Sequence, residues 1–189
     1  HLPLQRHLIG TPETIIVRAG TVEVDLFGLD RTPLGTWILE EGDLIILAGR
    51  PSMGKTALAT NIAYNAAANY TIEKNANGED EVVSGAVVGF FSLEMSAEQL
   101  ATRIISEQAM IPSERIRRGK ITEEEFAKIV EVTREMQALP LYIDATGGIT
   151  IAQVAARARR LKRQRGLGLL VVDYLQLLSG SSRRASEGR

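Results

Sequence analysis

The eight residues Gly49–Thr56 have the spacing G-x-x-x-x-G-K-T, which is typical of a loop that binds nucleotide phosphates. In such a loop the backbone N–H groups and the positive end of the following helix dipole point at one place, which suits a triphosphate. Lys55 would reach the β- and γ-phosphates, and the hydroxyl of Thr56 would bind Mg²⁺. The motif predicts that ATP is contacted by Gly49, Arg50, Ser52, Met53, Gly54, Lys55, Thr56 and the next residue, Ala57.

Two acidic residues follow predicted strands at the positions that an ATPase requires. Asp173 ends the apolar strand Leu169–Val172, where a carboxylate would hold the Mg²⁺ shell opposite Thr56. Glu94 follows the strand that ends at Ser92, where it would polarise a water molecule for attack on the γ-phosphate. Each residue could instead be a solvated carboxylate at a strand end. Because ligands of open α/β sheets gather at that edge, we favour the functional interpretation of both.

The elements that position these residues alternate between strand and helix from Asp43 onwards, which predicts an α/β fold with a mostly parallel sheet and helices on both faces. The expected strands are 43–48, 85–92, 141–144 and 168–173. The expected helices are 54–69, 96–110, 122–139 and 150–165, and the last three each begin with a capping box. A polar turn predicts a surface hairpin or mobile insertion at 70–84, and residues 112–118 predict a short turn.

Composition limits the classes of protein that are compatible with the chain. Its 189 residues suffice for one α/β domain, and no apolar run is long enough to span a membrane. The absence of cysteine excludes disulfides and thiolate-bound zinc, and it is compatible with a cytoplasmic location. The net charge of −1 argues against a bulk electrostatic grip on nucleic acid, although it does not exclude a local one.

One predicted helix, around 156–165, is strongly basic. It could follow a nucleic acid or form a solvated outer face. We favour the outer face, because no aromatic residue is interleaved for base stacking. Arg183 and Arg184 follow the strand that carries Asp173, so a DNA contact by this loop is a further expectation.

Three segments together resemble the DnaB-type replicative DNA helicases. Gly49–Ala57, Phe90–Ser96 and Val171–Leu177 are similar to the first three motifs of that family and follow in the same order. The resemblance covers about residues 42–187. Three linked motifs are far more specific than the phosphate loop alone.

The resemblance implies a RecA-like P-loop NTPase core that assembles into a homo-hexamer. The family hydrolyses ATP at subunit interfaces while it moves 5′ to 3′ on single-stranded DNA at the replication fork, and a primase and a helicase loader are candidate partners. Carried over by position, Lys55 and Thr56 would bind phosphate and Mg²⁺, Glu94 would be the catalytic base, and Asp173 would support the metal.

The resemblance also predicts a division of the chain. Residues 1–40 remain poorly assigned, and 41–189 would be a partial RecA-like ATPase domain that is truncated at its C-terminus. The family's polar γ-phosphate sensor, arginine finger and main DNA-contacting loops would lie beyond Arg189, so we expect a fragment of a helicase motor. Two alternatives stay open: another RecA-like DNA-dependent ATPase, and a regulatory module that binds nucleotide without catalysis.

Overall fold

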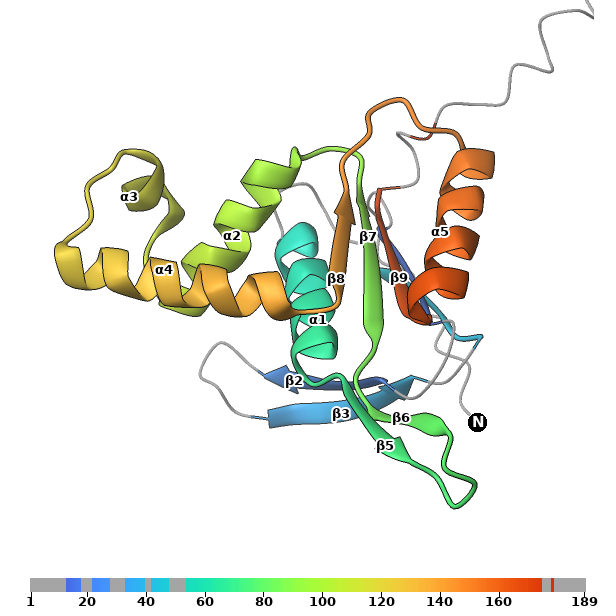
Figure 1. Ribbon diagram of the computed structural model, residues 1–189. Helices are drawn as coiled ribbons and strands as arrows, with labels where there is room; N and C mark the ends of the chain where they lie inside the picture. Colours follow the sequence, from blue (N-terminus) through green and yellow to red (C-terminus); the bar gives the residue numbers. More distant parts are fainter. Residues whose placement is uncertain are drawn as a thin grey trace, which may run out of the picture.

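From Leu44 onwards the strands and helices follow each other in the order that the sequence predicts, with one additional short helix (Figure 1). The computed structural model describes residues 13–17, 22–27, 33–39, 42–47, 54–174 and 178. The strands are β1 (Glu13–Val17), β2 (Val22–Phe27), β3 (Pro33–Leu39), β4 (Leu44–Leu47), β5 (Thr71–Lys74), β6 (Asp80–Ser84), β7 (Val87–Ser92), β8 (Leu141–Asp144) and β9 (Leu167–Asp173). The helices are α1 (Lys55–Ala68), α2 (Ala97–Ala109), α3 (Ser113–Arg117), α4 (Glu123–Ala138) and α5 (Ile151–Arg165).

The main sheet contains five strands in the order β4-β1-β9-β7-β8. β7 is parallel to both β8 and β9, whereas β1 is antiparallel to both β4 and β9. β4 therefore runs in the same direction as β9. The prediction of a mostly parallel sheet is confirmed, and the carboxyl ends of β4, β9, β7 and β8 lie at one edge.

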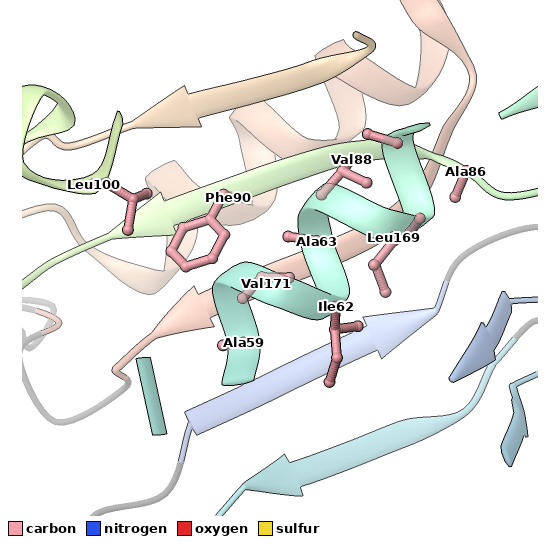
Figure 2. Close-up of a cluster of buried hydrophobic side chains, with 11 residues drawn as sticks. Ala59, Ile62, Ala63, Ala86, Val88, Phe90, Leu100, Leu169 and Val171 are labelled. Carbon is pink, nitrogen blue, oxygen red and sulfur yellow. The ribbon is translucent and has the colours of Figure 1, made fainter. Parts of the chain in front are cut away.

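Alternate residues of the central strands face opposite sides of the sheet, and a helix covers each side. Phe90 and Val171 form a buried cluster with Ala63 of α1, which crosses the strands on that side in Figure 2. Phe91 belongs to a second cluster with Val154 of α5. Full burial of each large apolar side chain contributes about 1.5–3 kcal/mol. These two layers confirm helices on both faces of the sheet.

Three helices begin with the reciprocal hydrogen bonds that the sequence predicts. At α2, the Ser96 hydroxyl accepts a hydrogen bond from the Gln99 N–H, and the Gln99 side chain accepts one from the Ser96 N–H. Thr122 and Thr150 begin α4 and α5 in the same way. Each pair satisfies backbone donors that the first turn of a helix leaves without a partner.

Residues 112–118 differ from the prediction, because they contain the short helix α3. The Arg115 guanidinium donates to the Lys120 carbonyl and to both carboxylate oxygens of Glu125 on α4. Ile116 packs beside a buried cluster that includes Ile111. A helix this short is unstable alone, so its neighbours in the fold stabilise it.

Strands β5 and β6 form an exposed antiparallel hairpin, which confirms the hairpin interpretation of 70–84. The Asn75 side chain closes its turn by accepting hydrogen bonds from the N–H groups of Asn77 and Glu79. Because β6 leads directly into β7, the hairpin lies at the amino edge of the parallel strands (Figure 1). This is the edge opposite Asp173.

Candidate active site

Three strands of the sheet end side by side at the carboxyl edge. Asp173, the last residue of β9, is the register partner of Ser92, the last residue of β7. Asp144, which ends β8, is aligned with Phe91 on the other side of β7. The Leu93 N–H donates to the Asp173 carbonyl at 2.7 Å, so the segment that carries Glu94 starts against the end of β9.

Asp173 is a fully buried carboxylate, with an exposed fraction of 0%. Neither of its side-chain oxygens has a hydrogen-bond partner among the residues that the structure describes. A buried carboxylate without a partner is costly, because the charge has lost its water. A cation beside Asp173 would remove this cost, which agrees with the position that the sequence predicts for a metal-supporting carboxylate.

Glu94 lies in a short turn between β7 and α2, and its side chain is exposed. Ser92 is only 1% exposed, and its hydroxyl donates to the Met95 carbonyl at 2.8 Å across this turn. That bond fixes the backbone on both sides of Glu94 while its carboxylate reaches solvent. The sequence did not identify Ser92 as a positioning residue, although a small hydroxyl residue two positions before the proposed base is the signal that could have done so.

Helix α1 begins differently from the three helices with capping boxes. Its cap residue, Gly54, has φ = 82°, in the left-handed region that favours glycine, and it has no side chain that could cap the first turn. Because α1 follows the carboxyl end of β4 along the chain, it begins at the same edge as Asp173. A helix N-terminus without a side-chain cap leaves backbone donors for a phosphate.

The structure describes part of the phosphate-contacting set. Lys55 and Thr56 open α1 with partly buried side chains, and Ala57 is exposed. Gly49, Arg50, Ser52 and Met53 lie outside the described residues, as do Arg183 and Arg184. The roles of all these residues remain predictions.

A polar network at the end of β8 was not predicted from the sequence. One Asp144 carboxylate oxygen accepts hydrogen bonds from the N–H and hydroxyl of Thr146, and the other accepts one from the Arg157 guanidinium of α5. Arg157 also donates to the Thr146 hydroxyl at 2.8 Å. Partial burial by itself raises the pKa of Asp144, but these hydrogen bonds outweigh it and hold the pKa below its ordinary value.

This network predicts an acid-sensitive contribution to stability. Replacement Asp144→Asn is expected to lower the free energy of unfolding by about 1 kcal/mol at neutral pH and Tm by about 2–4 °C. The folded-state pKa of Asp144 is lowered, so its stabilisation is full above the unfolded pKa of about 3.9. It is lost as the pH falls through the folded-state pKa. The Tm difference between wild type and Asp144→Asn should therefore shrink when melting curves are recorded at increasingly acid pH.

A matched control for this prediction is Asp80→Asn on the hairpin. Asp80 pairs with Lys74 at 2.7 Å, but both side chains are about two-thirds exposed. Such a surface ion pair contributes little, so Asp80→Asn should leave Tm nearly unchanged at every pH. A Tm difference for Asp144→Asn that stays constant as the pH falls would contradict the assigned role of the charged form.

Within the described part of the chain, no helix is long and apolar enough to cross a membrane.

Comparisons with known proteins identify the relatives of this chain. The model of the DnaB-like helicase C-terminal domain matches residues 22–189, which starts earlier than the resemblance visible in the motifs. The replicative DNA helicase DnaB of Rickettsia bellii is 42% identical over 182 residues, which cover 95% of this chain and 34% of that protein. The replicative DNA helicase DnaC of Bacillus subtilis is 41% identical over 155 residues, which cover 82% of this chain and 30% of that protein.

A solved structure shows the same likeness. A DnaB-like replicative helicase, described with its interactions with primase, superposes with a TM-score of 0.56 at 28% identity, covering 72% of this chain and 30% of that one. A separately solved ATPase domain superposes with the same score and identity over 72% of this chain and 44% of that one. The chain thus spans about a third of the length of the curated relatives. It belongs to the family of DnaB-like helicase C-terminal domains, and its fold is that of their RecA-like ATPase domains.

Proposed function

We propose that this chain is the ATP-binding part of a replicative DNA helicase motor, which unwinds duplex DNA 5′ to 3′ by hydrolysing ATP. The observation that carries the proposal is the carboxyl edge of the sheet. Three features lie at that edge. Asp173 is a buried carboxylate without a hydrogen-bond partner among the described residues, and Glu94 is an exposed glutamate on a turn fixed by hydrogen bonds. Helix α1 begins there at a glycine, which provides no side-chain cap. Family membership supports the same reaction.

The residues around the start of α1 would bind the nucleotide phosphates. The first N–H groups of α1 would donate to phosphate oxygens, and Lys55 would neutralise charge on the β- and γ-phosphates. Gly49, Arg50, Ser52, Met53 and Gly54 would form the loop around them, with Ala57 following in the helix. Gly54 fits this role, because its left-handed conformation turns the chain into α1 without a side chain at the turn.

The donors that would hold Mg²⁺ are the Thr56 hydroxyl and the Asp173 carboxylate. Mg²⁺ prefers oxygen ligands and is usually bound by one or two carboxylates together with substrate phosphates, so it requires no cage of acidic side chains. The oxygens of Asp173, which are buried and have no hydrogen-bond partner among the described residues, fit such an ion. When bound, Mg²⁺ would neutralise charge that develops on the phosphate oxygens.

Glu94 would act as the general base. Its carboxylate reaches solvent from a turn that hydrogen bonds from Ser92 and Leu93 hold against β9. There it would orient a water molecule for in-line attack on the γ-phosphate and accept its proton.

The wider assembly is part of the same proposal. A homo-hexamer would move on single-stranded DNA at the replication fork, in the cytoplasm, with residues 41–189 as the main part of its ATPase domain. Residues 1–40 would be a poorly assigned N-terminal segment, from which β1 adds a strand to the same sheet. A primase is a proposed partner, because one solved neighbour is a DnaB-like helicase described with its interactions with primase. A helicase loader is the second proposed partner.

Steady-state ATP hydrolysis by the purified chain, with and without single-stranded DNA, tests this function. We expect DNA to increase hydrolysis and Lys55→Ala to reduce it to background. A wild type that binds ATP but turns it over no faster than Lys55→Ala would contradict the motor and favour a non-catalytic nucleotide-binding module. Filaments on DNA in place of rings would favour another RecA-like ATPase.

A further inference from the structure

A groove of about 470 Å³ lies between helix α5 and the edge strand β8. This volume is within the range of about 300–1,000 Å³ that is usual for ligand sites. One end of the groove reaches the carboxyl edge at Asp144 and Thr146, and the other extends along α5 to Gln164. The phosphate-binding residues of the proposed active site do not line it.

The groove exists because α5 packs mainly against β7 and β9 and leaves β8 uncovered on that face. Figure 1 shows β8 and α5 on opposite sides of β7. Leu141 and Ile143 of β8 pack into the cluster on the α1 side, so Tyr142 and Asp144 face the α5 side. Gly89 of β7 is the register partner of Tyr142 and also lines the groove, and its missing side chain lets Leu161 of α5 pack closely against the strand.

The α5 side of the groove is cationic. Arg157, Arg160, Leu161 and Gln164 line it at the spacing of one helix face. Arg157 is held by Asp144 and Thr146, whereas Arg160 makes no hydrogen bond or ion pair with any residue that the structure describes. The whole helix carries six basic residues and no acidic residue. Its charge therefore complements a polyanion.

Tyr142 supplies the aromatic group that α5 itself lacks. Its side chain is 39% exposed and lines the groove opposite the arginines. The sequence favoured a solvated outer face for the basic helix because no aromatic residue is interleaved in it. The fold changes this interpretation, since it brings an exposed ring from another element to the same groove as Arg157 and Arg160.

We propose that this groove binds single-stranded nucleic acid, with a base stacked on Tyr142 and a backbone phosphate bound by Arg160. Cations beside an exposed aromatic ring are the combination that single-strand-binding surfaces use. Leu161 and Phe91 line the groove as well and give it an apolar side for the flat face of a base, which an acidic peptide would not require. The inference deepens the proposed function by assigning a surface to the DNA strand, and it rests on that function for the identity of the strand.

Fluorescence anisotropy of a labelled oligothymidylate with the full chain, without ATP, tests this site. Loss of one stacked base in Tyr142→Ala should weaken binding about fivefold or more, whereas Tyr142→Phe should retain it. Loss of one phosphate contact in Arg160→Gln should reduce the slope of log affinity against log salt by about 0.7. Arg163→Gln is the matched control, because it removes a charge from α5 outside the groove and should change the slope much less.

A photo-crosslinking oligonucleotide identifies the part of the chain that contacts the bound strand. We expect 4-thiothymidine to crosslink to the tryptic peptide that contains Tyr142. Equal affinity of wild type, Tyr142→Ala and Arg160→Gln would overturn the proposal. Equal salt slopes for Arg160→Gln and Arg163→Gln, or equally strong competition by polyglutamate, would also overturn it, since each indicates a general attraction for polyanions.

The two proposals fail separately. Lys55→Ala should abolish ATP turnover and leave the binding of oligothymidylate unchanged. If the binding of oligothymidylate does not depend on Tyr142 while ATP turnover is normal, only the proposed DNA-binding groove is contradicted. If binding depends on Tyr142 but the chain does not hydrolyse ATP, only the proposed motor function is contradicted.

Discussion

Replacement Glu94→Gln is expected to slow ATP hydrolysis by about 10²- to 10⁴-fold, the usual contribution of a general base. Glutamine keeps the shape of the side chain but cannot accept the proton of the attacking water. The affinity for ATP should stay the same, because the proposed phosphate contacts come from the start of α1. Glu94 is exposed and makes no side-chain hydrogen bond within the described residues, so its replacement should not alter stability. Single-turnover hydrolysis of radiolabelled ATP measures the rate, and calorimetric titration measures the affinity.

A matched control is Glu81→Gln on the hairpin, at the amino edge of the sheet. Glu81 is an exposed glutamate as well, on the strand β6 that leads into β7. Its replacement should leave both turnover and affinity unchanged. If Glu94→Gln hydrolyses ATP as fast as wild type, Glu94 is a solvated carboxylate at a strand end and another group activates the water.

Replacement Asp173→Asn is expected to stabilise the nucleotide-free protein and to remove the dependence of ATP binding on Mg²⁺. Both oxygens of Asp173 are buried without a hydrogen-bond partner in the described part of the chain. An uncharged amide there costs less, so we expect a gain of about 1–3 kcal/mol in the free energy of unfolding. For a chain of this size this corresponds to a rise in Tm of about 2–12 °C. The same change removes the carboxylate that would hold the metal.

The matched control for this second prediction is Asp144→Asn, at the end of β8, which is parallel to β9 and lies on the other side of β7. Asp144 accepts hydrogen bonds from Thr146 and Arg157, so its replacement should lower Tm where Asp173→Asn raises it. Opposite signs would show that Asp173 is kept for function at a cost in stability. A lower Tm for Asp173→Asn, with unchanged Mg²⁺ dependence of ATP binding, would contradict the metal-supporting role.

Local sequence signals predicted the helices and parallel strands well. The capping boxes at Ser96, Thr122 and Thr150 identified three helix starts correctly, because their hydrogen bonds join residues only three positions apart. The apolar run that ends at Asp173 indicated a buried strand, since both faces of a central parallel strand are covered. Placing Asp173 and Glu94 at one edge then followed from the direction of the strands.

Features that depend on distant parts of the chain were not predicted. β1 lies between β4 and β9, where Thr14 pairs with Val172, a residue far away in the sequence. No local sequence pattern reveals such a pairing. The short helix α3 depends on the contact between Arg115 and Glu125. The groove beside Tyr142 can be predicted only when it is known which strand α5 leaves uncovered. In each case tertiary packing, and not local preference, decides the outcome.

Calorimetric titration of ATP into wild type and Lys55→Ala, each with and without Mg²⁺, tests the central claim most directly. We predict that wild type binds ATP and that Mg²⁺ tightens this binding. We also predict that Lys55→Ala weakens the binding of ATP about tenfold or more, because a charge-assisted hydrogen bond to phosphate is lost. Equal affinities in wild type and Lys55→Ala, with no effect of Mg²⁺ on either, would contradict an ATP site at this edge of the sheet.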